Sequence, residues 1–399
     1  FNMFRIFVCF FVFCSFFSPV QAADSNTEDK TPIEKNCLVL LVDFPDAKHH
    51  PEREQVEKRF NIQLNKYFDE MSYGKMKVNF TVTNDWHTLP NPVSHYRIAP
   101  QNLKVDKNKI RALIQDSIDS VDSYVDFSKY DFVVLYLAAE LKEYGMIGLC
   151  GYPGMLGWKE EVVLKTKSGQ VINGGIAIFL YRAHLGTLFH DIAHVLGGVK
   201  NGKRVVPCLY DHDLQAKPGD QRAVFENSII NMGFWDPMSC HFYKYRVPPP
   251  GISSWTKLRL GWIDENKIKE VSPGETVEVV LGPLEDGSSD TLVIKIPLTE
   301  TTYYLIENRQ KTGTFDKDLY GDGVLIMYAD DTIPECRNGK APVKLIDADP
   351  SMPKLGGASF DVGKEGKKDV YLDETNNIKI EIKEKLDNGS YRILIGTAN

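Results

Sequence analysis

The segment HDIAHVLG, residues 190–197, limits the possible folds of this chain more than any other stretch. Residues four apart lie on one face of an α-helix, so His190 and His194 could hold one metal ion from the same side. Gly197 offers a helix stop, because glycine adopts a left-handed conformation without a clash at Cβ. The sequence therefore predicts a helix that carries a metal-binding pair of histidines, with Asp191 beside the first of them.

The composition is that of an ordinary globular protein with an acidic balance. Of the 399 residues, 43% are hydrophobic and 25% are charged, and the length suggests two or three domains. The net charge of −7 argues against a nucleic acid or an anionic membrane as the partner.

Residues 1–22 have the pattern of a secretory signal peptide. Arg5 precedes an apolar run over residues 6–17, and small residues around Ala22 offer a cleavage site. The apolar run is too short to span a bilayer comfortably. No later stretch is long and apolar enough for a membrane helix, so we expect a secreted protein with no membrane anchor after signal removal. Residues 23–36 are polar and predict a flexible lead-in.

Five cysteines follow the predicted cleavage site. An odd number in a secreted protein predicts up to two disulfides and at least one free thiol. The five are Cys37, Cys150, Cys208, Cys240 and Cys336.

Strands and helices alternate in the first part of the chain, whereas strands alone follow in the second part. In the first part, the patterns predict strands at 37–44, 75–83, 130–138 and 171–181, helices at 51–71 and 107–121, and a glycine-rich loop at 145–157. In the second part, they predict strands at 276–281, 291–296, 303–307, 324–328 and 378–382, then a last hairpin whose Asn388-Gly389 matches a type I′ turn. The predicted fold class is α+β, with a mixed sheet and the histidine-bearing helix over residues 37–265 and an all-β domain over residues 266–399.

Several motifs point to one family. The histidine segment matches the zinc-protease pattern H-E-x-x-H, except that Asp191 replaces the glutamate. Roughly forty residues later, the turn WDPM (235–238) carries a methionine, as the turn beneath the metal does in metzincins. The further matching segments are VLLVDFPD (39–46), YFDEMSYGKMKV (67–78), VDFSKYDFVVLY (125–136), KLRLGWID (257–264) and ENRQKTGTFD (307–316). On these motifs, from about residue 37 to about residue 330, the chain resembles the secreted metalloproteases related to bacterial immune inhibitor A, a metzincin-like family.

The resemblance implies a zinc endopeptidase that acts on proteins or peptides. It implies that residues 37–265 are a metzincin-like catalytic domain and that His190 and His194 are zinc ligands. Met238 would be the methionine that packs beneath the site. Asp191 would take the proton of a zinc-bound water.

Asp191 is the first departure from the family pattern. Its carboxylate is shorter than that of glutamate by one carbon–carbon bond, about 1.5 Å. A misplacement of about 1 Å can lower a rate by about 100-fold. We therefore expect reduced activity, and the alternative is an inactive pseudoprotease that binds proteins or peptides in the retained cleft.

The third ligand is the second departure. The family places an acidic ligand three residues after the glycine, but Lys200 occupies that position here. An insertion over residues 198–205 moves the similar segment PCLYD to 207–211, and strict matching makes Cys208 the third zinc ligand. In the alternative, Cys208 forms a disulfide with Cys150 or Cys240, and the site is completed by Asp211, His212 or Asp213.

Other residues near these motifs give further expectations. The clusters DKD (316–318) and GDG (321–323) could bind Ca²⁺, although a solvated acidic turn has the same pattern. Tyr243 and Tyr245 could donate to an oxyanion, although tyrosines in such a loop also serve packing. His184 is expected to face away from the histidine pair, whereas His241 is close enough in sequence to Met238 to reach the site.

Overall fold

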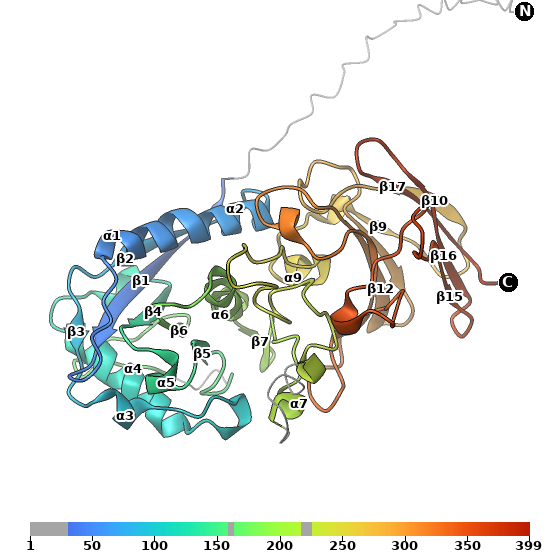
Figure 1. The fold of residues 1–399 in the computed structure, drawn as a ribbon. Helices are drawn as coiled ribbons and strands as arrows, with labels where there is room; N and C mark the ends of the chain where they lie inside the picture. Colours follow the sequence, from blue (N-terminus) through green and yellow to red (C-terminus); the bar gives the residue numbers. More distant parts are fainter. Residues whose placement is uncertain (1–30, 159–162, 217–225) are drawn as a thin grey trace, which may run out of the picture. The chain divides into compact units, whose positions relative to one another are not determined.

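The computed structural model describes residues 31–158, 163–216 and 226–399. The predicted signal peptide and residues 23–30 of the predicted lead-in lie outside these residues. The prediction of a flexible lead-in is wrong for residues 33–36, which pair with residues 76–79 as the start of the first strand. Residues 32–399 form one compact unit of mixed α/β structure, with a mixed sheet in the first part and further β-sheets in the C-terminal part (Figure 1). Among the described residues, no helix has the length and apolar character needed to cross a membrane.

The sheet of the first part has the order β2-β1-β4-β6-β5, with the short β3 beside β1. Its strands are β1 (Ile33–Asp43), β2 (Met76–Val82), β3 (His87–Thr88), β4 (Phe132–Leu137), β5 (Gly148–Tyr152) and β6 (Ile176–Leu180). All neighbours pair in parallel except β5, which runs antiparallel to β6 at the edge.

The prediction of a glycine-rich loop at 145–157 is wrong in part, because β5 lies within it. A side chain at Gly148 would bring a Cβ within 2.6 Å of the Thr187 Cγ2 atom on the neighbouring helix. Glycine there reflects close packing of the strand rather than a turn.

Alternate residues of β1 face opposite sides of the sheet, and both sides are covered by helices. Val39 and Leu41 belong to one core and Leu38 and Leu40 to another. The first core is covered by α1 (Arg53–Glu57), the π-helical segment Lys58–Leu64, α2 (Asn65–Ser72) and α6 (Leu185–Gly197). The second is covered by α3 (Val93–Tyr96), α4 (Lys107–Val121) and α5 (Leu141–Tyr144). A strand buried on both sides explains the continuous apolar run that the sequence carries here.

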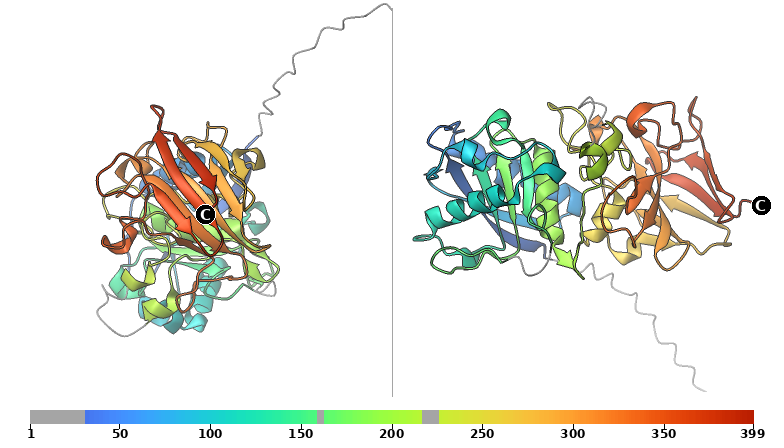
Figure 2. Two further views of the ribbon diagram at one scale, coloured as in Figure 1. Left: turned by 90° about the vertical axis from the view of Figure 1, so that its right-hand side faces the viewer. Right: turned by 90° about the horizontal axis from the view of Figure 1, so that it is seen from below.

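Two sheets form the C-terminal part (Figure 2). The first has the order β14-β13-β12-β11-β9 and comprises β9 (Ile268–Glu270), β11 (Val293–Pro297), β12 (Thr302–Arg309), β13 (Gly323–Asp330) and β14 (Val343–Leu345). The second has the order β10-β17-β16-β15 and comprises β10 (Val277–Leu281), β15 (Val370–Asp373), β16 (Ile378–Lys385) and β17 (Tyr391–Gly396). Shorter elements are β7 (Val199–Lys200), β8 (Lys203–Arg204), α7 (His212–Ala216) and α9 (Ser254–Arg259).

The sheet that contains β12 is buried on both faces. Tyr304 and Ile306 pack in the core between the two C-terminal sheets, whereas Leu305 packs in the core that also contains α2 and α6. The change in architecture falls close to residue 266, but the two parts share this core. Whether they are separate domains stays a prediction.

The prediction of a type I′ turn in the last hairpin is wrong. Only Gly389 has a positive φ, +82°, and Asn388 does not. The Gly389 N–H donates to the Leu386 carbonyl at 2.9 Å, and the Leu386 N–H donates to the Ser390 carbonyl at 2.8 Å. This is the longer loop in which a single glycine takes the left-handed position.

Candidate metal centre

Helix α6 carries the histidine pair and is buried over almost its whole length. His184 caps its start, because its Nδ1 accepts the Gly186 N–H at 3.1 Å, and its Nε2 contacts the Val247 carbonyl at 3.0 Å. His184 is therefore turned away from the pair, as predicted. The helix ends at Gly197, as predicted, but the positive φ of +62° belongs to Gly198, and at Gly197 the neighbouring Val206 leaves no room for a side chain.

His190 and His194 point the same ring atom toward each other. Each Nδ1 faces a carbonyl oxygen, that of Pro237 at 2.9 Å for His190 and that of Val206 at 2.6 Å for His194. A carbonyl only accepts, so each Nδ1 must carry the hydrogen, and each Nε2 then has a bare lone pair. Burial lowers the pKa of both rings, which keeps them neutral. The two Nε2 atoms are 3.1 Å apart, so two lone pairs face each other at contact distance.

Cys208 completes this group. The residues that appear as an insertion in the sequence form the hairpin of β7 and β8, and the chain after it returns to the histidines. The Cys208 Sγ lies 3.5 Å from the His190 Nε2 and 3.4 Å from the His194 Nε2. All three residues are buried, and their ligand atoms lie within 4.8 Å of one another. They are the one group of this kind in the described part of the chain.

The other candidates for the third ligand, Asp211, His212 and Asp213, make contacts outside the group of His190, His194 and Cys208. Asp211 Oδ1 accepts the N–H groups of Asp213 and Leu214 at 3.0 Å, which caps α7, and its Oδ2 accepts the Gly339 N–H at 2.6 Å. Asp213 forms a bidentate pair with Arg337. His212 lines the same cavity as the ligand group, and its ring lies beside Tyr210.

A buried ion pair lies directly behind Cys208. Arg204 binds both oxygens of Glu335 at 2.8 and 2.7 Å, and its Nη2 is 3.8 Å from the Cys208 Sγ. Burial raises the pKa of the Cys208 thiol, but the Arg204 guanidinium and the nearby His212 outweigh burial and hold this pKa below its usual value. The environment therefore favours the thiolate, which is the form that binds metal. Sequence analysis missed this pair, because 131 residues separate its members.

Asp191 lies beside the ligands and is 5% exposed. Burial raises the pKa of its carboxyl to about 7, against an attraction to His190 that lowers it. Its Oδ2 atom is buried with no hydrogen-bond partner among the described residues. A Cβ at Gly148 would lie 3.0 Å from this oxygen, so the glycine of β5 leaves room at the carboxylate.

The turn that contains Met238 is linked to the ligand group through the Pro237 carbonyl, which faces the His190 ring. Met238 is fully buried, and its N–H donates to Asp236 Oδ1 at 2.8 Å. The other Asp236 oxygen accepts from the hydroxyls of Ser253 and Thr256, both at 2.6 Å. Because Pro237 also receives the His190 Nδ1 hydrogen bond, the turn fixes the orientation of this ring.

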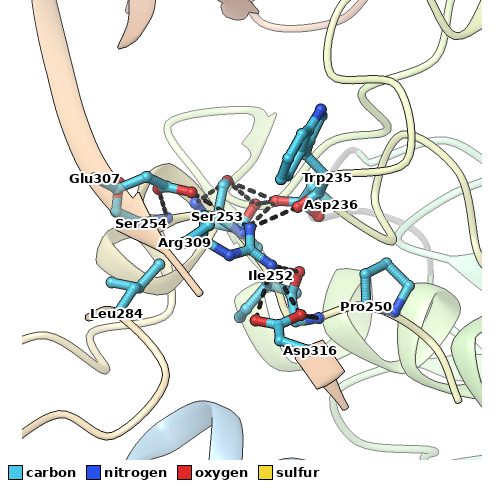
Figure 3. A network of polar contacts seen from close by, with 12 residues as sticks. Trp235, Asp236, Pro250, Ile252, Ser253, Ser254, Leu284, Glu307, Arg309 and Asp316 are labelled. Atoms are coloured by element: carbon cyan, nitrogen blue, oxygen red, sulfur yellow. Dashed lines mark hydrogen bonds and ion pairs between the residues drawn. The ribbon is translucent and has the colours of Figure 1, made fainter. Parts of the chain in front are cut away.

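This turn is joined to the C-terminal sheets by a cluster of buried charges (Figure 3). Arg309 on β12 is fully buried and donates to the Trp235 carbonyl at 2.8 Å. Its other contacts are the Gly251 carbonyl and the carboxylates of Glu285, Glu307 and Asp316. Two carboxylates of the predicted Ca²⁺ cluster are thus paired with cationic side chains: Asp316 binds Arg309, and Asp322 binds Lys364 at 3.0 Å.

A cavity of about 340 Å³ opens onto the ligand group. It lies along β5 and contains His241, whose ring centroid is 4.3 Å from that of His190 and whose Nδ1 contacts the Thr187 hydroxyl at 3.0 Å. His241 thus reaches the site, as its position in the sequence suggested. Tyr243 instead packs on Phe234, and Tyr245 donates to the Arg182 carbonyl.

The five described cysteines are all free and buried. The predicted disulfides, including one from Cys208 to Cys150 or Cys240, are therefore not formed among them. Burial raises the pKa of the thiols of Cys37, Cys150, Cys240 and Cys336, in contrast to that of Cys208.

In comparisons with known proteins, no family model matches this chain and no curated protein matches it significantly. The relation to the immune inhibitor A-like metalloproteases accordingly stays a prediction from the sequence motifs, and the case for a function depends on the geometry of the site.

Proposed function

We propose that this protein is a secreted, zinc-dependent endopeptidase with a metzincin-like catalytic part. One observation carries the proposal: the His190 and His194 Nε2 lone pairs face each other at 3.1 Å with a thiol beside both. Two bare lone pairs at this distance repel each other, and a cation between them removes the repulsion. Secretion is supported by the pattern of residues 1–22 and is tested by the N-terminal sequence of the exported protein.

The donor set fits zinc. Zinc binds histidine nitrogen at about 2.0–2.1 Å and cysteine sulfur at about 2.3 Å in tetrahedral geometry, so its ligand atoms are about 3.3–3.8 Å apart. The separations of 3.1, 3.4 and 3.5 Å are close to this range. Three protein ligands leave a fourth position for water, as in catalytic zinc sites.

Zinc bound there would polarise a scissile carbonyl and lower the pKa of a bound water. Asp191 lines the same cavity, and its Oδ2, buried and without a partner in the described residues, would accept the proton of that water. β5 lies at the edge of its sheet and lines the cavity; because its Cys150 and Gly151 carbonyls accept from Met155 and Leu156, an extended peptide would add at the start of the strand, Gly148 and Leu149. These features together suit the hydrolysis of a peptide bond.

The short side chain at position 191 favours a second candidate function, the binding of peptides without cleavage. An aspartate there places its carboxylate about 1.5 Å short of a glutamate. If no water-bridged path makes up this distance, the cavity and the β5 edge would still bind a peptide.

Metal analysis and a variant series test the two candidates. We expect one zinc per chain in the purified protein and chelator-sensitive cleavage of an unstructured protein substrate. Asp191→Glu should raise the rate by up to about 100-fold, and Asp191→Ala should abolish cleavage. Asp213→Glu, a matched change at an aspartate bound to Arg337, should leave the rate unchanged. Zinc without cleavage in wild type or Asp191→Glu would favour the binding function, and absence of zinc would exclude both the enzyme and the metal centre.

A further inference from the structure

A second crevice lies where the strand order of the first sheet reverses. From β1 the chain passes through α1 and α2 to β2 on one side, and later through α4 to β4 on the other side. The segments that leave the carboxyl ends of β1 and β4 cover opposite faces, because α1 and α2, after β1, pack in one core and α5, after β4, packs in the other. Neighbouring connections therefore diverge between the carboxyl ends of β1 and β4. In open α/β sheets this point is where ligands bind.

A cavity of about 550 Å³ occupies this place. Its walls come from the segment after β1 with Lys48, His49 and His50, from Tyr136 near the end of β4, and from Arg59 in the π-helical segment. None of its lining residues lines the cavity of the metal centre. The two cavities are separate sites.

The lining of this crevice holds basic groups and no carboxylate. Asp43 is buried and holds Lys48 at 3.1 Å and His50 at 2.7 Å, but it does not line the cavity. Glu143 likewise holds His49 at 3.1 Å without lining the cavity. The acids therefore hold the nitrogens of Lys48, His49 and His50 from outside the cavity, and the side chains of these three residues form part of its wall. Arg59 is the cation of this lining that no carboxylate of the described residues holds, in a chain with a net charge of −7.

Arg59 makes no ion pair within the described residues. Its Nη2 donates to the Ala183 carbonyl, and its Nε is buried with no acceptor. A buried donor without an acceptor is rare in folded proteins and indicates a missing partner. A guanidinium presents a planar set of donors that suits the oxygens of a carboxylate or phosphate.

We propose that this crevice binds a small oxyanion, the carboxylate or phosphate group of a ligand, with Arg59 as the principal donor and Lys48 as the second. Aromatic stacking orients the two histidine rings that line the crevice. His50 lies on Trp86 with ring centroids 4.6 Å apart, and His49 lies on Tyr181 at 5.8 Å. The inference does not depend on peptidase activity, because it uses none of the residues of the metal centre.

Titration calorimetry of the full chain tests the proposal with inorganic phosphate and, separately, with acetate, at constant ionic strength maintained with chloride. We expect saturable binding of at least one of the two anions to the wild type. Arg59→Gln should weaken it by at least about tenfold, and Lys48→Gln, at a half-exposed side chain, by about threefold. Lys66→Gln removes the same charge from an exposed position on α2 and should not change it.

Circular dichroism of each variant checks that the fold is retained. If Arg59→Gln does not fold, the Lys48→Gln result decides. Equal weakening by Lys66→Gln would reveal general charge screening and overturn the proposal, as would saturable binding that neither crevice variant alters. Failure of both anions to bind the wild type would overturn it as well, whatever the outcome of the peptidase assays.

Discussion

The metal centre and the Arg309 cluster are both buried and polar, but their polar atoms are satisfied in different ways. Around Arg309, the guanidinium contacts two carbonyls and three carboxylates, and Glu285 Oε2 is the one carboxylate oxygen of the cluster without a partner in the described residues. At the metal centre, two ring nitrogens and a sulfur face one another, and an Asp191 oxygen has no partner. A closed network stabilises a shape, whereas an open one leaves binding capacity for a ligand.

The two regions are physically joined, and this explains how a stable network could support a reactive site. Arg309 donates a hydrogen bond to the Trp235 carbonyl, and the Met238 N–H donates to the Asp236 carboxylate. Between these two contacts, the Pro237 carbonyl accepts a hydrogen bond from the His190 Nδ1. The C-terminal sheets thereby help to orient one ligand. Four predictions separate the roles of the two regions.

The largest expected effect is the loss of stability in Arg309→Met. This change leaves three carboxylates buried without their shared cation, and breaking a buried pair in this way costs about 3–5 kcal/mol. Urea unfolding at neutral pH measures the loss. Arg392→Met removes an arginine whose partners are exposed and should cost no more than about 1 kcal/mol. Similar losses in the two variants would mean that the Arg309 cluster is no stronger than a surface pair.

Removal of metal should give the next largest effect. A ligand present at about 100 times its dissociation constant stabilises the folded state by about 2.7 kcal/mol. A chelator should therefore lower the thermal unfolding midpoint of the wild type. It should leave the midpoint of His194→Ala unchanged, because this variant lacks one of the metal ligands. If the chelator leaves the wild-type midpoint unchanged, the proposal that the histidine–cysteine group binds metal would be contradicted.

Asp191 should contribute to the metal-free protein a stabilisation that is lost as pH rises toward neutrality. The pKa of Asp191 is raised from 3.8 to about 7 by burial, so the folded protein holds this proton more tightly than the unfolded chain. The resulting stabilisation is complete below pH 3.8 and is lost as pH rises through about 7. Asp191→Asn cannot titrate and should lack this part of the pH dependence. Denaturant unfolding of both proteins across this range measures the difference, and identical profiles would contradict the raised pKa.

The smallest effect is expected for Asp211→Ala. This change removes a helix cap and should cost about 1 kcal/mol of stability without loss of zinc. Cys208→Ser should instead lose most of the zinc. The reverse pattern, with zinc lost in Asp211→Ala alone, would make Asp211 the third ligand.

Local sequence patterns predicted much of the fold and part of the site. The helix at 107–121 has the predicted bounds, because its apolar spacing and its cap lie within the segment itself. The histidine pair was accessible for the same reason, whereas Cys208 was predicted from the resemblance to the family's third-ligand segment. β5 was missed because Gly148 serves packing against Thr187 and Gly151 packing against Ile176, which no local pattern reveals. Long-range partners such as Arg204 and Glu335 likewise become visible only in three dimensions.

The central claim is that His190, His194 and Cys208 hold one zinc ion. X-ray absorption at the zinc edge of the purified protein tests this claim most directly. We predict one sulfur at about 2.3 Å and nitrogen or oxygen neighbours at about 2.0–2.1 Å, with the sulfur absent in Cys208→Ser. A protein without zinc, or a zinc shell without sulfur, would contradict the account.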